Sequence, residues 1–282
     1  MTTLRPPSRL SPPTGIQAGW YPDPHGYPLM RYYDGRAWTA RTTGVLTARP
    51  DLGQHPVLPV GVAVGAVVVL IASLIASRFL LDALIELEWP ILVYALISMV
   101  AGYGPSLWWC WYASRRWGTG RPAQDLGLRF RWVDAGWGPV VWISAFGCQV
   151  VMVLLVEATG IPLVGNTEAI GELDVDRAYV IALLISAVVA APFVEEVVFR
   201  GLMMRGLLSR LAVVPAVAVQ GALFGLAHVD PVRGTGNIGL ALILSAVGVA
   251  FGGAAYLLRR LGPVIIAHAI FNGAVMLIVL LS

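Results

Sequence analysis

Three charged residues lie close together in one apolar stretch of the chain. The segment AVVAAPFVEEVVFRGLMM contains Glu195, Glu196 and Arg200 shortly after Pro192. A charged side chain at the centre of a membrane helix costs roughly 2.5–3.5 kcal/mol, so such residues persist mainly where they are paired or functional. Glu196 and Arg200 are four residues apart and can form an ion pair on one helix face. Glu195 is rotated by about 100° and is the less well paired carboxylate, which makes it the better candidate for a general base.

A purely structural role for these three charges is the alternative. They could form a network that neutralises itself and only fixes helix packing. Two adjacent glutamates and one arginine leave one negative charge over, however, and this favours a catalytic interpretation. Pro192 can also loosen the backbone hydrogen bonding of the turn before the glutamates.

Two histidines fall in other apolar stretches. In FGLAH, Phe224 stands one turn before His228, and in HAIFN, His268 stands one turn before Asn272. A lone histidine in an apolar helix more often packs against its neighbours than catalyses a reaction. Two histidines, a glutamate pair and an asparagine on three helices can supply a general base, a partner that positions water, and donors to an oxyanion. The combination predicts a hydrolytic site.

The elements that position these residues must be membrane helices. The chain has 282 residues, of which 57% are hydrophobic and 12% are charged, and its mean hydropathy is +0.75. This composition excludes a soluble domain, and the basic residues form no patch for a nucleic acid. Cys110 and Cys148 lie in apolar runs and are assigned neither a disulfide nor a metal.

Apolar runs long enough to cross about 30 Å of hydrocarbon recur along the chain. We predict an all-α polytopic membrane protein with about 7–8 transmembrane helices around an intramembrane active site, the eighth arising if one helix is split or re-entrant. The first run follows about 50 polar residues, which favours a retained signal anchor over a cleaved signal peptide. The expected spans are Val57–Ser77, Trp89–Tyr112, Trp137–Glu157, Tyr179–Met203, Val213–His228, Ile238–Leu258 and Val264–Leu281.

The arginines are concentrated in every second loop between the expected spans. Loops that border the cytoplasm carry an excess of positive charge, and here the arginines follow the second, fourth and sixth spans while the loops between carry acidic residues. We therefore expect a multi-pass protein of the cell membrane with a cytoplasmic N-terminus. The arginines concerned are Arg115, Arg116, Arg121, Arg129, Arg131, Arg205, Arg210, Arg259 and Arg260.

The residues before the first span divide into three parts. Residues 1–17 are rich in Pro, Ser and Thr and are expected to form a flexible tail. Residues 18–43 are expected to form a small cytoplasmic β-ribbon, residues 44–56 a linker, and residues 57–282 the transmembrane domain.

The ribbon has a hairpin signal at Asp34-Gly35, between the aromatic-rich flanks 30–33 and 36–38. Trp20 and Trp38 are expected to clamp Pro22 or Pro24 across it. The stretch resembles a short domain of unknown function that occurs in many bacterial membrane proteins and has a GWYPDP opening and an RYWDG..WT close, with Tyr33 here in place of the usual Trp. Binding a protein partner and merely stabilising itself are equally open roles for this ribbon.

The three chemical motifs together resemble those of the CPBP family, which includes the type II CAAX prenyl endopeptidases and the bacteriocin-processing or self-immunity (Abi) proteins. EEVVFR, FGLAH and HAIFN match its ordered motifs EExxxR, FxxxH and HxxxN. The resemblance covers a core at about residues 137–281, and the stretch 125–129 before it also looks similar to the family. It implies an intramembrane endopeptidase that acts on a membrane protein or peptide.

In the mechanism that the resemblance implies, Glu195 and His228 activate a water molecule that attacks the scissile carbonyl. His268 and Asn272 stabilise the oxyanion, while Glu196 and Arg200 hold the site together. A divalent metal such as zinc, held by Glu195, His228 and His268, is the alternative. We favour the metal-free version because the HExxH spacing is absent.

Two rival functions remain open at this point. A non-catalytic immunity or scaffold protein could use the same fold, and a proton-coupled transporter could use the glutamate pair, although the motif-bearing spans show no internal repeat. The expected spans also place His228 at a different depth from Glu195 and His268. A fifth helix that starts late, or a broken fourth helix near Pro192, would bring the three residues level.

Overall fold

The computed structural model describes residues 17–22, 24, 29–45, 58–163, 177–229 and 237–281. Residues 1–16 of the expected tail 1–17, most of the linker 44–56 and the acidic loop 164–176 lie outside the described residues. The chain divides into two compact units, Met1–Gln54 and His55–Ser282.

The N-terminal unit contains a three-stranded antiparallel sheet with strands β1 (Gly19–Pro22), β2 (Leu29–Tyr33) and β3 (Trp38–Val45) in that order. The predicted turn joins β2 to β3. Its Asp34 carboxylate accepts hydrogen bonds from the backbone N–H groups of Ala37 (2.7 Å) and Arg36 (2.8 Å). These two bonds hold the pKa of Asp34 below its usual value. Gly35 has a φ of 92°, which glycine adopts at little cost.

The expected clamp between Trp20 and Trp38 is wrong. Trp20 pairs across the strands with Tyr32, whereas Trp38 pairs with Tyr33. Neighbouring residues of a strand point to opposite faces of its sheet, so the two tryptophans lie on opposite faces. Each packs against a tyrosine ring instead, with ring centroids 5.2 Å apart in both cases.

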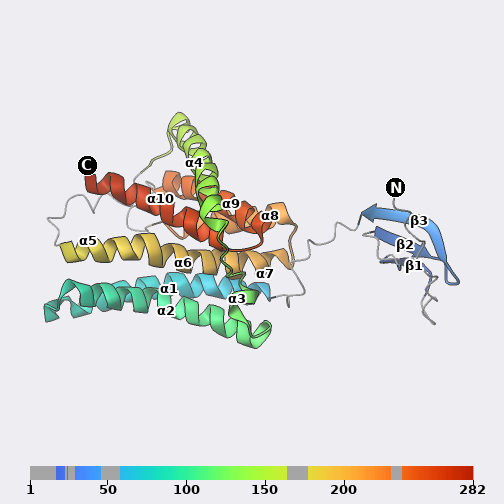
Figure 1. The fold of residues 1–282 in the computed structure, drawn as a ribbon, viewed down its shortest axis with the longest axis horizontal. Helices are drawn as coiled ribbons and strands as arrows, with labels where there is room; N and C mark the ends of the chain where they lie inside the picture. The colour runs from blue at the N-terminus through green and yellow to red at the C-terminus, as the bar shows by residue number, and fades with distance from the viewer. Residues whose placement is uncertain are drawn as a thin grey trace. The chain divides into compact units, whose positions relative to one another are not determined.

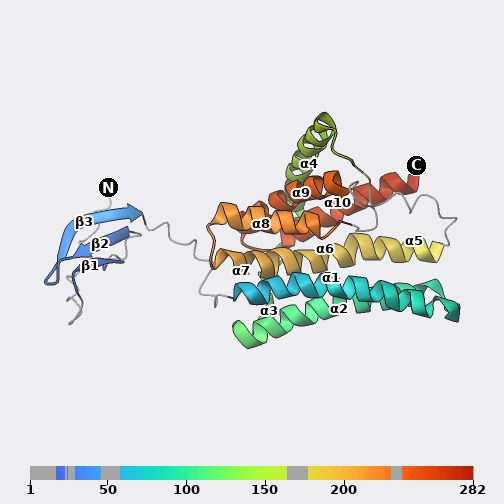
Figure 2. The same ribbon diagram turned by 180° about the vertical axis from the view of Figure 1, so that it is seen from behind.

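The second unit is a bundle of long apolar helices (Figures 1 and 2). Helices α1 and α2 pair with each other, and the long segment α5–α7 lies between that pair and the helices α8, α9 and α10, while α4 crosses α9 and α10 on the outer side. The bounds are α1 Val60–Leu84, a 3₁₀ turn Ile85–Leu87, α2 Ile91–Trp117, α3 Pro122–Asp125, α4 Asp134–Thr159, α5 Arg177–Leu184, α6 Ala191–Glu196, α7 Met204–Leu208, α8 Val213–Leu226, α9 Asn237–Leu258 and α10 Gly262–Leu281.

Six helical segments in the described part of the chain are long and apolar enough to cross a membrane. They correspond to six of the seven expected spans, and their ends differ by at most five residues except that the first span runs to Leu87 and not to Ser77. Large apolar side chains such as Val68, Leu96 and Ile143 are exposed on the outer faces of the helices, as in a protein surrounded by lipid. The chain is therefore a polytopic all-α membrane protein with a small β unit.

The fifth expected span, Val213–His228, is shorter than predicted. Helix α8 has 14 residues and ends at Leu226, so it extends about 21 Å at 1.5 Å per residue and falls short of the hydrocarbon thickness. His228 therefore lies in the turn that follows α8 and not within the helix. The difference in depth that the sequence suggested for His228 arose from treating α8 as a full span.

The arginine-rich loops meet at one end of the bundle. Arg260 forms an ion pair with Asp134, with 2.6 Å between Nη2 and Oδ1. The backbone N–H of Leu261 donates to the carbonyl of Gly127, so the loop after α9 contacts the loop after α3. Gly206 in α7 lies against Ala63 near the start of α1. The expected cytoplasmic loops and the beginning of α1 thus share one end.

Glycines allow α8 and α9 to approach closely. A Cβ on Gly248 would lie 2.9 Å from the Cα of Gly221, a distance that real Cβ atoms essentially never show. Small residues at a helix crossing let two backbones approach in a membrane. The close crossing also brings the Gly248 carbonyl near the segment α5–α7, where it accepts a hydrogen bond from Arg200.

Candidate active site

The helix that carries the glutamates departs twice from α-helical geometry. The continuous segment Arg177–Leu208 contains two π-helical stretches, Ile185–Ala190 (η2) and Val197–Met203 (η3). They flank α6, which carries Glu195 and Glu196. Short π-helical stretches inside α-helices occur frequently at functional sites. The irregular helix is the element that orients both carboxylates.

Glu196 and Arg200 form the ion pair that their spacing predicts. Arg200 Nη1 lies 2.7 Å from Glu196 Oε1, and both side chains are completely buried. Arg200 Nη2 also donates to the Gly248 carbonyl at 3.3 Å. A buried charge needs such partners, because removing an ion from water is costly.

Three phenylalanine rings surround the guanidinium group of Arg200. Its central carbon lies 4.3 Å from the ring centroid of Phe224, 5.5 Å from that of Phe251 and 5.9 Å from that of Phe199. The faces of aromatic rings attract cations, and the attraction grows when water is excluded. Phe224, the first residue of the FGLAH motif, therefore contributes directly to holding the arginine.

Glu195 faces both motif histidines. Its Oε2 atom lies 3.8 Å from His228 Nε2 and 3.8 Å from His268 Nε2. These distances are too long for hydrogen bonds. Within the described residues, Glu195 Oε2 is buried and has no hydrogen-bond partner. A buried oxygen without a hydrogen-bond partner requires an explanation, and a catalytic role is one such explanation.

Each histidine is oriented by a bond at its other ring nitrogen. His228 Nδ1 lies 2.7 Å from the carbonyl oxygen of Phe224, which can only accept a hydrogen bond. The hydrogen of a neutral His228 ring is therefore on Nδ1, and its Nε2 faces Glu195 with a lone pair. His268 Nδ1 lies 2.8 Å from Glu196 Oε1, the oxygen that also contacts Arg200. The ion pair thus holds the second histidine as well.

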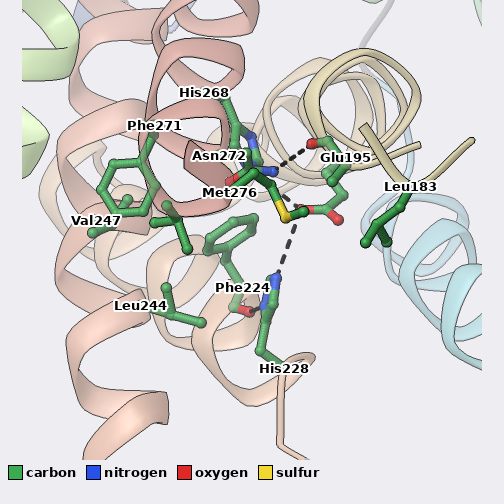
Figure 3. A pocket seen from close by; sticks show the side chains of 12 residues that line it. Leu183, Glu195, Phe224, His228, Leu244, Val247, His268, Phe271, Asn272 and Met276 are labelled. Carbon is green, nitrogen blue, oxygen red and sulfur yellow. Dashed lines mark hydrogen bonds and ion pairs between the residues drawn. The ribbon is translucent and has the colours of Figure 1, made fainter. Parts of the chain in front are cut away.

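Asn272 is tied to the catalytic helix. Its Nδ2 donates to the Ala187 carbonyl at 2.8 Å. The side chain also lines the cavity beside Glu195, as Figure 3 shows. The amide group has a second N–H, so the bond to Ala187 leaves one donor for another partner.

These polar groups line one side of a largely apolar cavity of about 230 Å³ (Figure 3). His228 is the most accessible of the three titratable side chains, with 24% exposed against 15% for Glu195 and 6% for His268. Leu183 separates this cavity from a second apolar cavity of about 340 Å³ next to α1 and α2. The residues that line the catalytic cavity are Leu183, Ala187, Glu195, Phe224, His228, Leu244, Val247, His268, Phe271, Asn272, Val275 and Met276.

The residues suggested as zinc ligands are Glu195, His228 and His268, with 3.8 Å from Glu195 Oε2 to each Nε2. Among the described residues, no three His, Cys, Asp or Glu side chains come together closely enough to hold one ion. His268 also uses Nδ1 on Glu196, whose Oε1 is shared with Arg200. We adopt the metal-free version for the proposed mechanism, and a chelator assay tests that choice.

All six residues predicted from the motifs come together. Glu195, Glu196 and Arg200 lie on one helix, His228 follows α8, and His268 and Asn272 lie on α10. The sequence analysis missed the contacts from Ala187, Gly248 and Phe251. Two of these act through backbone carbonyls, which every residue has, so only the geometry could reveal them. Of the three residues, only Phe251 acts through its side chain, and its aromatic ring was the one feature of the sequence that could have predicted a contact with Arg200.

Comparison with known proteins identifies two regions of the chain. Residues 177–274 match the family model described as Type II CAAX prenyl endopeptidase Rce1-like. Residues 18–51 match the model Protein of unknown function (DUF2510). No curated protein and no solved structure matches the chain.

The first match includes all three motifs and the whole helix from Arg177 to Leu208, but not α4. It is narrower than the core expected from residue 137. The matched helices are those that carry the buried ion pair, both histidines and Asn272. The part of this multi-pass membrane protein that carries the three motifs, residues 177–274, is therefore similar to the type II CAAX prenyl endopeptidases of the CPBP family.

Proposed function

We propose that this protein is an intramembrane endopeptidase that hydrolyses a peptide bond of a membrane-associated substrate with a water molecule activated by Glu195. The observation that supports this most directly is the arrangement around Glu195 Oε2. A buried carboxylate oxygen without a partner lies 3.8 Å from two histidine nitrogens, at the edge of a cavity.

A water molecule fits this arrangement. The Glu195 oxygen and His228 Nε2 are both hydrogen-bond acceptors when the carboxylate is ionised and the histidine is neutral. Two acceptors 3.8 Å apart can share the two hydrogens of one water at about 2.8 Å from each. The lone pairs of that water then point away from both groups, toward a substrate carbonyl in the cavity.

The reaction follows from this placement. The water oxygen forms a bond to the carbonyl carbon while Glu195 takes one of its hydrogens as general base. The tetrahedral intermediate then collapses, the C–N bond breaks, and Glu195 returns the proton to the leaving amine. His228 orients the water, because its own ring is fixed by the Phe224 carbonyl.

The oxyanion requires donors on the opposite side. Asn272 has one N–H left after its bond to Ala187. His268 can donate only if Nε2 carries a hydrogen, and since Nδ1 faces the Glu196 carboxylate, the ring is then an imidazolium. The positive charge of His268 then balances the second of the two glutamate carboxylates, since Arg200 compensates only one of them. Donors fixed in a site without water stabilise an oxyanion strongly.

The test is cleavage of a library of membrane peptides by the purified protein, comparing wild type with Glu195→Gln. Removal of the general base is expected to lower kcat by about 100- to 10,000-fold. Glu157→Gln is the matched control, because Glu157 is an exposed glutamate at the end of α4. Full activity in a folded Glu195→Gln protein would refute the proposal.

A chelator arm of the same assay decides between the two accounts of the site. Cleavage that Glu195→Gln abolishes and that a zinc chelator leaves intact supports the glutamate mechanism. Cleavage lost in both arms would establish a metal site instead. None of the contacts above favours the non-catalytic immunity or scaffold role over hydrolysis.

We also propose that the protein lies in the cell membrane with its N-terminus in the cytoplasm. Support comes from the arginine-rich loops, which meet at the end of the bundle where α1 begins. The substrate is then a membrane protein or peptide that reaches the cavity from the bilayer. Whether the N-terminal sheet binds a further protein is a separate hypothesis, which a pull-down with the full chain can test.

A further inference from the structure

One backbone carbonyl of the catalytic helix lacks a backbone donor. In the π-helical stretch η2, hydrogen bonds join residues five apart, and the Ala191 N–H accordingly donates to Ser186 O. The next bond in this pattern would run to the Ala187 carbonyl from residue 192. Residue 192 is proline, which has no N–H. The Ala187 carbonyl is therefore left free for another donor.

That donor is Asn272. Its Nδ2 lies 2.8 Å from Ala187 O, across the contact between α10 and the catalytic helix. A free carbonyl inside a membrane bundle is costly unless a side chain or water satisfies it. Asn272 thus receives a fixed hydrogen-bond partner only because proline stands at position 192.

This bond determines the direction of the second N–H of Asn272. The carboxamide group is planar, so holding one N–H on Ala187 fixes the plane and the other N–H with it. Ala187 and Asn272 both line the catalytic cavity with Glu195. Without the Ala187 bond the amide could rotate away from the substrate.

We infer that Pro192 is a positioning residue for catalysis that acts through the Ala187 carbonyl to orient the Asn272 amide toward the oxyanion. The inference rests on the proposed peptidase function. It assigns no contact with substrate to Pro192. An alanine at this position would restore an N–H to the helix, and in either helical register Ala187 O would then have a backbone donor that competes with Asn272.

The experiment is a double-mutant cycle of Pro192→Ala and Asn272→Ala in the full-length protein, with kcat, KM and the thermal midpoint Tm measured for each variant. Loss of one oxyanion donor by Asn272→Ala is expected to lower kcat by about 100- to 1,000-fold. Pro192→Ala should lower kcat by about 10-fold with KM within about 2-fold, since a misoriented donor weakens transition-state binding more than substrate binding. In the Asn272→Ala background, Pro192→Ala should change kcat by less than about 2-fold.

The Tm values test the same coupling without relying on cleavage. Asn272→Ala should lower Tm in the wild-type background, where it strands the Ala187 carbonyl, and should lower it less when residue 192 is alanine. Pro105→Ala is the control, because Pro105 lies inside α2, which packs mainly against α1 and not against the helix that carries Asn272. It should leave the effect of Asn272→Ala unchanged.

Additive effects of the two substitutions on both kcat and Tm would overturn the inference, as would a wild-type kcat in Pro192→Ala. If the wild-type protein cleaves nothing, the proposed function fails and the Tm cycle still decides the coupling. If Asn272→Ala lowers Tm equally in both backgrounds, the inferred coupling is refuted. A smaller effect of Asn272→Ala on Tm in the Pro192→Ala background would support the coupling.

Discussion

Removing the charge of Arg200 should destabilise the helical unit more than any surface charge change. Arg200 and Glu196 are fully buried and 2.7 Å apart, and Arg200 also lies among three aromatic rings. Breaking a buried ion pair by removing one partner costs about 3–5 kcal/mol, because the other charge stays buried and unpaired. For a unit of this size, 1 kcal/mol corresponds to about 2–4 °C, so Arg200→Met should lower Tm by roughly 6–20 °C.

The assay is thermal unfolding of the purified protein in one detergent, with Arg115→Met as the control. Arg115 is exposed and lies over the Trp111 ring, 5.4 Å from its centroid, and an exposed charge of this kind contributes about 0–1 kcal/mol. The double variant Glu196→Gln, Arg200→Met should recover part of the loss, since it removes the stranded charge. A Tm for Arg200→Met equal to that of the control would refute the reasoning, and so would a double variant whose loss equals the sum of the two single losses.

Two further predictions concern the crossing of α8 and α9. Gly248→Ala should lower Tm and weaken the bond from Arg200, because the new methyl group would lie 2.9 Å from the backbone of Gly221. The control Gly253→Ala, where a Cβ has open space, should leave Tm within about 2 °C of wild type. Equal shifts in Tm for the two variants would contradict this account. Gln220→Leu should raise Tm, since both polar atoms of the fully buried Gln220 side chain lack a partner among the described residues and an unsatisfied buried group costs about 1–3 kcal/mol. A lower Tm for Gln220→Leu would show that its amide has a partner, such as water.

The sequence was sufficient wherever the relevant geometry is local. The ion pair of Glu196 and Arg200 follows from a separation of four residues on a helix, and the orientation of His228 by Phe224 O follows the same spacing. The turn at Asp34 could likewise be predicted from the sequence, because its hydrogen bonds reach only two and three residues along the chain. In each case the partners are set by helix or turn geometry alone.

Two predictions that depended on where a helix ends or on strand register were wrong. The length of α8 was overestimated because apolar composition continues past Leu226 to the turn that carries His228. The clamp between Trp20 and Trp38 failed because strand pairing places them on opposite faces of the sheet. Hydrophobic content identifies a membrane helix but does not locate its last turn.

The sequence by itself determined the types of the six site residues, their order and, for all except His228, the helices that carry them. Only the tertiary structure decided that Glu195 Oε2 lies 3.8 Å from both histidines, that Glu196 Oε1 serves Arg200 and His268 together, and that Asn272 bonds a carbonyl of another helix. The physical reason is that the contacts with His228, His268 and Asn272 join elements far apart in sequence, and the Asn272 bond uses a backbone carbonyl, which all residues share. Their distances depend on how closely α8, α9 and α10 pack against the catalytic helix, which small residues such as Gly248 permit but do not specify.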